Sequence, residues 1–298
     1  MRLTLRATPN RLADRRVERL ILRDLTAALR SISNRIADTG RPKLVVNPVV
    51  WRKPSDGKMN PLVANQAAFF SESFQASLCA NGVWEREKLL EGQRLDAYAE
   101  FECESGDAIS ANDLYQWLPM CTEPSRQIPA IFARNFGSFV ERAIFRADDL
   151  PKMLKLRSTR KPGGATVRVG VEFETGNIAS SFRALLKLGL LFRLGKIDVG
   201  VFVTSNNKAL AAAAIWPPSN RNGSFEELES RRWREVLDFP VLGIGFEPDG
   251  FDLSEAVLRR DGYHLRPVPQ NKFLKVGAKQ YEEWRLPGEK SYWYVEVK

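Results

Sequence analysis

A strand, a helix and a second strand within about forty residues most constrain how this chain can fold. Residues 167–174 alternate between apolar and other side chains without interruption, which is the period of a half-buried strand. Apolar residues then recur at helical spacing from Ile178 to about Gly195, and residues 197–204 alternate again. A strand, a helix and a strand in this order are typical of a sheet covered by helices. The sequence therefore predicts an α/β fold.

Further elements are expected on both sides of this unit. Within a strand expected over 94–103, alternation places Leu95 and Ala97 on one face and Asp96 and Tyr98 on the other. The remaining expected elements are one amphipathic helix over 10–39, an edge strand near 44–50, a helix near 69–82, a helix that begins with a capping box at Ser224, a strand over 239–246 and an edge strand over 292–297.

Composition excludes several classes of site. The chain of 298 residues contains one histidine, His264, so it cannot hold a metal cluster of several histidines. Its three cysteines, Cys79, Cys103 and Cys121, form no CxxC pair, so neither a disulfide framework nor a zinc site is expected, and a reducing cytoplasm fits best. No apolar run is long enough to span a bilayer, so no membrane is expected as a partner. The net charge of +9 suits an anionic polymer as a partner.

The main chemical signal is a pair of carboxylates, Glu172 and Glu174, two residues apart on the strand over 167–174. On a strand this spacing places both side chains on the same face, about 7 Å apart. The other face is wholly apolar and must pack into the domain. Two such carboxylates repel each other unless they are protonated, solvated or neutralised by a cation, and Mg²⁺ prefers oxygen ligands of this kind. The alternative is an exposed sheet face whose charges lie in water.

Residues 169–180, Val-Gly-Val-Glu-Phe-Glu-Thr-Gly-Asn-Ile-Ala-Ser, resemble the active-site strand and following helix of the BamHI-type family of type II restriction endonucleases. The similarity continues within 183–198, 220–229 and 243–246, and a weaker match covers 60–88. The resemblance implies a central mixed β-sheet flanked by helices, the PD-(D/E)xK nuclease core, in a single domain over 1–298. Residues 103–165 then form an unmatched insertion, and residues 253–298 form a C-terminal extension.

The resemblance also implies an activity: Mg²⁺-dependent, sequence-specific hydrolysis of double-stranded DNA by a homodimer, giving 5′-phosphate ends without an organic cofactor. Glu172 matches the family's metal-bridging ligand, and Glu174 matches the residue that orients or deprotonates the attacking water. Glu87 matches an auxiliary carboxylate. Asp96, in Asp-Ala-Tyr-Ala-Glu-Phe, matches the metal-binding aspartate, although it lies unusually far before Glu172 in sequence. Asp149 is the reserve candidate, but its surroundings also read as a turn.

Six residues align with DNA-contacting positions of the family: Asn177, Ala179, Ser180, Arg183, Asn220 and Arg221. Two of them depart from the family pattern, because Ala179 replaces a serine and Asn220 replaces an aspartate, which implies an altered base preference. The alternatives are helix capping for Asn177 and plain surface charge for the arginines. The basic stretch over 152–168 either contacts phosphates or is a solvated loop.

Three hypotheses follow. The first is a type II restriction endonuclease. The second is a DNA nuclease of the same core with relaxed specificity, which would degrade a plasmid to a smear and not to discrete fragments. The third is a DNA-binding protein that no longer cuts, which would bind DNA tightly in Ca²⁺ and leave it intact in Mg²⁺.

Overall fold

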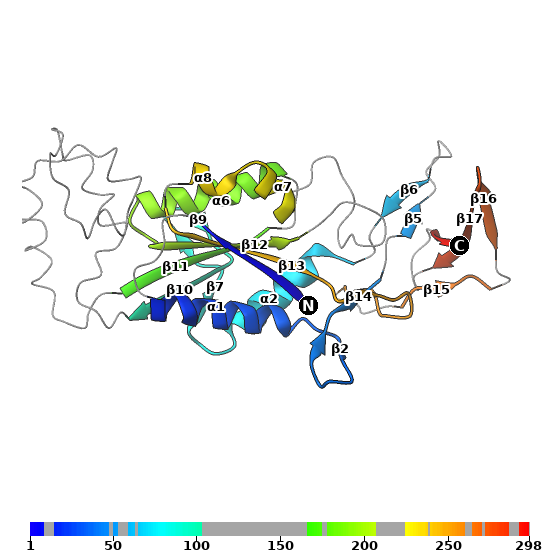
Figure 1. Ribbon diagram of the computed structural model, residues 1–298, viewed down its shortest axis with the longest axis horizontal. Coiled ribbons are helices and arrows are strands. Elements are labelled where there is room, and N and C mark those ends of the chain that lie inside the picture. The colour runs from blue at the N-terminus through cyan, green and yellow to red at the C-terminus, as the bar shows by residue number, and fades with distance from the viewer. Residues whose placement is uncertain are drawn as a thin grey trace, which may run out of the picture.

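The computed structural model describes residues 1–8, 15–47, 50–52, 59–62, 65–102, 166–174, 178–206, 224–237, 239–259, 264–269, 272–285 and 292–297. Its centre is a six-stranded sheet with the order β1-β13-β12-β11-β10-β7 (Figure 1). The central pairs β11/β12 and β12/β13 are parallel, whereas the outer pairs are antiparallel, so the sheet is mixed as expected. The strands are β1 (Arg2–Ala7), β7 (Trp84–Arg86), β10 (Ala97–Glu102), β11 (Thr166–Phe173), β12 (Val199–Ser205) and β13 (Val241–Glu247).

Helices cover both faces of this sheet (Figure 1). On one face, α1 (Arg15–Arg30) and α2 (Ala67–Cys79) pack against the apolar side of β11, in a core that includes Val169 and Phe173. On the other face lies α6 (Ile178–Arg193), with the short helices α7 (Phe225–Ser230) and α8 (Trp233–Val236), in a second core around Phe202. The α/β prediction, with helices on both faces of a mixed sheet, is confirmed.

The prediction of one helix over 10–39 is wrong at its end, because α1 stops at Arg30. The side chain of Asn34 donates to the backbone carbonyl of Val45 at 2.7 Å and accepts from the Val45 N–H at 2.9 Å. Asparagine competes in this way with helical hydrogen bonds. The chain then forms a hairpin of β2 (Arg35–Ile36) and β3 (Pro42–Lys43). Ile36, which the helical spacing assigned to the buried side, is 77% exposed.

Leu95 is a second correction, because it packs into the α6 core and not into the α1/α2 core with Ala97. Strand β10 begins at Ala97, so strict alternation does not extend back to Leu95. The short hairpin of β8 (Leu89–Leu90) and β9 (Gln93–Arg94) directly precedes it. Gly170 leaves room for the Leu95 side chain, because a Cβ atom on Gly170 would lie only 3.0 Å from Leu95 Cδ1.

The C-terminal residues build a second sheet that sequence patterns did not predict (Figure 1). Strand β18 (Tyr292–Val297) was expected at an edge, but it lies between β17 (Lys279–Arg285) and β5 (Val50–Arg52). That prediction is wrong because β5 comes from a distant part of the chain. The other strands of this sheet are β6 (Asn60–Leu62), β15 (Arg266–Pro267) and β16 (Phe273–Val276). A separate small pair joins β4 (Val45–Val46) and β14 (Gly250–Phe251). In the described ranges, no helix has the length and apolar character to cross a membrane.

Candidate active site

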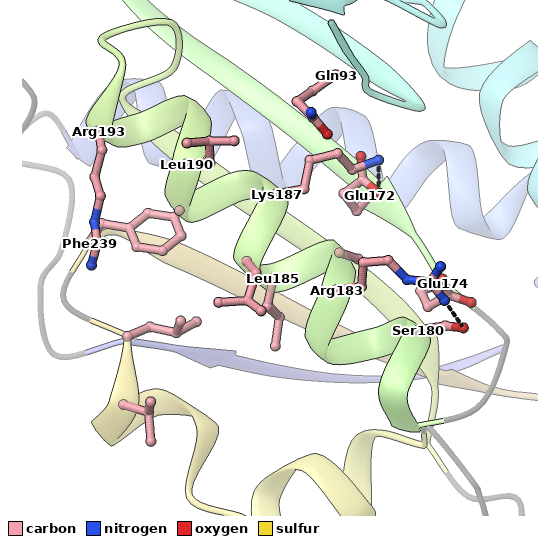
Figure 2. Close-up of a pocket in the computed structure, with 15 residues that line it drawn as sticks. Gln93, Glu172, Glu174, Ser180, Arg183, Leu185, Lys187, Leu190, Arg193 and Phe239 are labelled. Carbon is pink, nitrogen blue, oxygen red and sulfur yellow. Dashed lines mark hydrogen bonds and ion pairs between the residues drawn. The ribbon is translucent and has the colours of Figure 1, made fainter. Parts of the chain in front are cut away.

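Glu172 lies near the end of β11 and is buried, with 6% of the residue exposed. Its Oε2 atom forms an ion pair of 2.7 Å with Lys187 Nζ, which reaches across from α6 (Figure 2). The other oxygen, Oε1, is buried and has no hydrogen-bond partner in the described part of the chain. Burial raises the pKa of Glu172 to about 8; the charge of Lys187 opposes this, and Asp96 and Glu174 add to it. A buried carboxylate with one unsatisfied oxygen is a costly arrangement without a further cation.

Asp96 lies next to Glu172 across the sheet. The antiparallel register pairs Ala97 with Val171, so Asp96 comes opposite Glu172 one step before β10 begins. Asp96 Oδ2 accepts a hydrogen bond of 2.7 Å from the backbone N–H of Phe173. Burial raises the pKa of Asp96, although the Phe173 hydrogen bond acts in the opposite direction. The structure therefore brings Asp96 to Glu172 despite their separation in sequence, whereas Asp149 lies outside the described residues.

Glu174 and Glu87 lie around this pair. The negative charges of both raise the pKa of Asp96, which places them within electrostatic reach. Glu174 follows the last residue of β11 and is partly buried, and its backbone N–H donates to Val203 at 2.9 Å. Glu87 is exposed, with a φ of 50°, and its backbone N–H donates to the Asp96 carbonyl at 3.1 Å. All four expected catalytic carboxylates thus lie in one region of the fold.

A pocket of about 820 Å³ opens beside these carboxylates, along α6. Glu172 and Glu174 line it together with Ser180, Arg183 and Lys187 (Figure 2). Arg183 donates to Ser180 Oγ at 3.1 Å, so two of the expected DNA-contacting residues touch each other. The remaining lining is mainly apolar and includes Leu186, Leu190, Val236, Leu237 and Phe239.

Of the other expected DNA-contacting residues, the structure describes only Ala179. Ala179 lies exposed in the first turn of α6, beside the pocket residue Ser180. Asn177, Asn220 and Arg221 lie outside the described residues, as does the basic stretch over 152–165. Of the α6 residues aligned with the family, the structure therefore brings Ser180 and Arg183 to the same pocket as the carboxylates.

The donor set fits a hard divalent cation. Within the described ranges, no three His, Cys, Asp or Glu side chains converge closely enough to enclose a metal by themselves. Mg²⁺ does not need such a cage, because it usually takes one or two carboxylates and fills its octahedron with water and phosphate oxygens. Asp96 and Glu172 supply two neighbouring carboxylates, and Glu172 Oε1 is an oxygen without a partner in the described chain.

Two residues of the site were not predicted as functional. Lys187 is the counter-ion of Glu172, and Gln75, on α2, donates to Asp96 Oδ1 at 2.8 Å. Helical spacing could have found Lys187, because it lies seven residues after Ser180 and four after Arg183, on one helix face. No comparable sequence signal points to Gln75, since its contact depends on how α2 packs against the sheet.

Comparisons with known proteins agree with the resemblance. A family model described as restriction endonuclease BamHI matches residues 14–252. The type II restriction enzyme BamHI of Bacillus amyloliquefaciens is 33% identical over 108 residues, which are 35% of this chain and 47% of that enzyme. The chain therefore matches about half the length of this relative. The crystal structure of restriction endonuclease BGLII complexed with a DNA 16-mer aligns over 100% of both chains, with a TM-score of 0.37 and 10% sequence identity.

Proposed function

The chain belongs to the BamHI restriction endonuclease family, and on this premise we propose that it is a type II restriction endonuclease that hydrolyses double-stranded DNA at a specific sequence. The observation that carries the proposal is the pair of the half-buried Asp96 and the buried Glu172, with a Glu172 oxygen that lacks a partner in the described chain. Glu172 lines the pocket, and a carboxylate with a strongly raised pKa in such a place is typical of a functional site.

We infer that Asp96 and Glu172 are the residues that would hold a Mg²⁺ ion. An ion bound there would polarise the scissile phosphoryl oxygen and lower the pKa of a water molecule. Glu174, at the end of β11, orients or deprotonates the attacking water, and Glu87 is an auxiliary carboxylate. Attack on the phosphorus breaks the bond to the 3′ oxygen, so the products carry a 5′-phosphate and a 3′-hydroxyl.

We propose that the first turns of α6 contact the DNA. The start of a helix offers unpaired backbone N–H groups to phosphates, and Ser180 and Arg183 lie there on the pocket side. Arginine suits the paired acceptors of guanine, and we propose base contacts for Arg183, Asn177 and Arg221. Ala179, Ser180 and Asn220 complete the set. The net charge of +9 adds attraction to the phosphate backbone.

We propose that two copies of the chain form the active dimer through the outer side of α6. Cutting both strands of a palindromic site requires two active sites related by a two-fold axis. Leu186, Leu190 and Leu194 follow one another at four-residue spacing and are 69%, 44% and 46% exposed. With Val236 of α8, which is 72% exposed, they form an apolar surface that includes the apolar lining of the pocket, because Leu186, Leu190 and Val236 all line it. A second copy of α6 packed there would cover these leucines and place the two sites close together.

Incubation of the protein with plasmid DNA and Mg²⁺, followed by sequencing of the ends, tests the proposal. We expect discrete fragments whose ends share one sequence and carry 5′-phosphates, and no cutting when EDTA removes the metal. A smear with unrelated ends would show a nuclease of relaxed specificity. Intact plasmid in Mg²⁺ together with tight binding in Ca²⁺ would show a DNA-binding protein that no longer cuts.

A further inference from the structure

A hydrogen-bonded chain of side chains runs from the molecular surface to Asp96. Gln75, on α2, is 4% exposed, and its Nε2 atom donates to Asp96 Oδ1 at 2.8 Å. Its Oε1 atom accepts a hydrogen bond of 2.8 Å from Arg86 Nε, on strand β7. Arg86 is itself exposed. The buried amide therefore links an exposed guanidinium to the carboxylate beside Glu172.

The chemistry of the three groups fixes the direction of this chain. A guanidinium has donors and no acceptor, so the Gln75 oxygen must face Arg86. The NH₂ group of Gln75 must then face Asp96, which as a carboxylate only accepts. A reversed amide would set a donor against a donor at Arg86 and an acceptor against an acceptor at Asp96. Arg86 thus selects the one amide orientation in which Gln75 donates to Asp96.

Asp96 is consequently held at both oxygens. Gln75 donates to Oδ1, and the Phe173 backbone N–H donates to Oδ2 at 2.7 Å. Each carboxylate oxygen has two lone pairs, so each one keeps a lone pair after accepting one hydrogen bond. The two donors fix the plane of the carboxylate and leave these lone pairs available for a cation. Donors placed in this way orient metal ligands in many proteins and change metal affinity by 10- to 100-fold when lost.

We propose that Gln75, itself oriented by Arg86, is a positioning residue that sets the carboxylate of Asp96 for divalent-cation binding. The inference rests on the proposed function, in which Asp96 is a metal ligand. Gln75 contacts neither the cation nor the DNA; it acts through Asp96. Arg86 acts one step further away, through Gln75. The competing explanation is that Gln75 merely fills space between α2 and the sheet.

Binding of Mn²⁺ to the full chain, measured from the electron paramagnetic resonance signal of free Mn²⁺, separates these explanations. Gln75→Met keeps the side-chain length but removes the hydrogen bonds to Asp96 and Arg86, together with a longer one of 3.4 Å to Ser71 Oγ. We expect Mn²⁺ to bind this variant about tenfold or more weakly. Arg86→Met removes only the hydrogen bond between Arg86 and Gln75, at the exposed end of the chain of side chains. We expect this variant to lose less Mn²⁺ affinity than Gln75→Met. Arg86→Lys keeps a donor for the Gln75 oxygen and should restore most of the affinity.

The double variant gives the sharpest comparison. Because Arg86 acts through Gln75, adding Arg86→Met to Gln75→Met should weaken Mn²⁺ binding no further. Additive losses would contradict the relay. Arg6→Met, which removes an exposed arginine from β1 at the opposite edge of the sheet, is the matched charge control and should bind Mn²⁺ normally. Thermal denaturation without metal checks that each variant is folded.

Plasmid cleavage across a range of Mg²⁺ concentrations, run in parallel, keeps the two proposals apart. A parental protein that cleaves DNA and binds Mn²⁺, with Gln75→Met and Arg86→Met variants that bind Mn²⁺ equally well, would overturn the relay alone. A parental protein that neither binds Mn²⁺ nor cleaves would overturn the proposed function itself. Unchanged cleavage and unchanged Mn²⁺ affinity in Gln75→Met would show a space-filling role, because methionine occupies similar space.

Discussion

Lys187 Nζ lies 2.7 Å from Glu172 Oε2, and this ion pair joins α6 to β11 beside the pocket. The same ammonium group donates to the Arg94 carbonyl at 2.7 Å. Burial penalises the charged form of Glu172 more than Lys187 stabilises it, so the pKa of Glu172 stays raised at about 8. Without metal, the site therefore contains a carboxylate that the surrounding protein does not fully satisfy.

This imbalance makes the stability of the metal-free protein depend on pH. Glu172 titrates near 4.5 when unfolded and about 8 when folded, so between these values the folded state holds a proton that the unfolded state has released. The free energy of unfolding should fall as the pH rises through this window, by an amount on the order of 4 kcal/mol from this group. Glu172→Gln should remove this component. Urea denaturation in EDTA at pH 5, 7 and 9 measures it.

Lys187→Met supplies the companion measurement. It removes the charge that lowers the pKa of Glu172, so the pKa should rise further and the fall in stability should extend to higher pH. If the free energy of unfolding depended on pH in the same way in the parental protein, Glu172→Gln and Lys187→Met, the raised pKa of Glu172 and its dependence on Lys187 would be contradicted.

The two candidate aspartates should behave differently. Asp96→Asn keeps the shape of the side chain and one of the two oxygens that accept from Gln75 and the Phe173 N–H, and it removes the charge beside Glu172. We predict that it abolishes cleavage in Mg²⁺ and still allows DNA binding, whereas Asp149→Asn cleaves at close to the parental rate. Cleavage time courses under enzyme excess provide the measurement. Activity lost in Asp149→Asn and kept in Asp96→Asn would reverse the assignment.

The apolar surface of α6 can be tested with a matched pair of substitutions. Leu190 and Leu5 are 44% and 43% exposed, but Leu190 lies on α6 and Leu5 on the edge strand β1. Leu190→Lys should convert the dimer to a monomer, because a charge would be buried between the two helices. Leu5→Lys should leave the dimer intact. Sedimentation velocity distinguishes the two states, and a parental protein that is monomeric, or a Leu190→Lys dimer, would contradict the proposed surface.

Local periodicity predicted the parts of the fold that depend on local sequence. Strand β11 and helix α6 were found within a few residues, because alternation and helical spacing are uninterrupted there. The capping box was also found: Ser224 Oγ accepts from the Glu227 N–H at 3.3 Å. The end of α1 was missed because it depends on Asn34 bonding to Val45, eleven residues away.

In the site, too, only the features that depend on local sequence could be predicted. Glu172 and Glu174 could be recognised from their spacing on one strand, and Asp96 from its match to a family motif. Nothing local could reveal that Asp96 lies opposite Glu172, since 75 residues separate them and the register of β10 against β11 brings them together. Gln75 and the partnership of Lys187 with Glu172 also depend on packing, because α2 and α6 approach the sheet from opposite faces.

The most direct test compares cleavage and binding in Glu172→Ala and Glu174→Ala. On plasmid DNA with Mg²⁺, we predict that each variant loses cleavage, while gel-shift titrations in Ca²⁺ show DNA binding close to that of the parental protein. Both residues line the pocket, and in the proposed mechanism they act on the cation and the attacking water, not on the DNA backbone. Cleavage by either variant at the parental rate would contradict the proposed role of these two carboxylates.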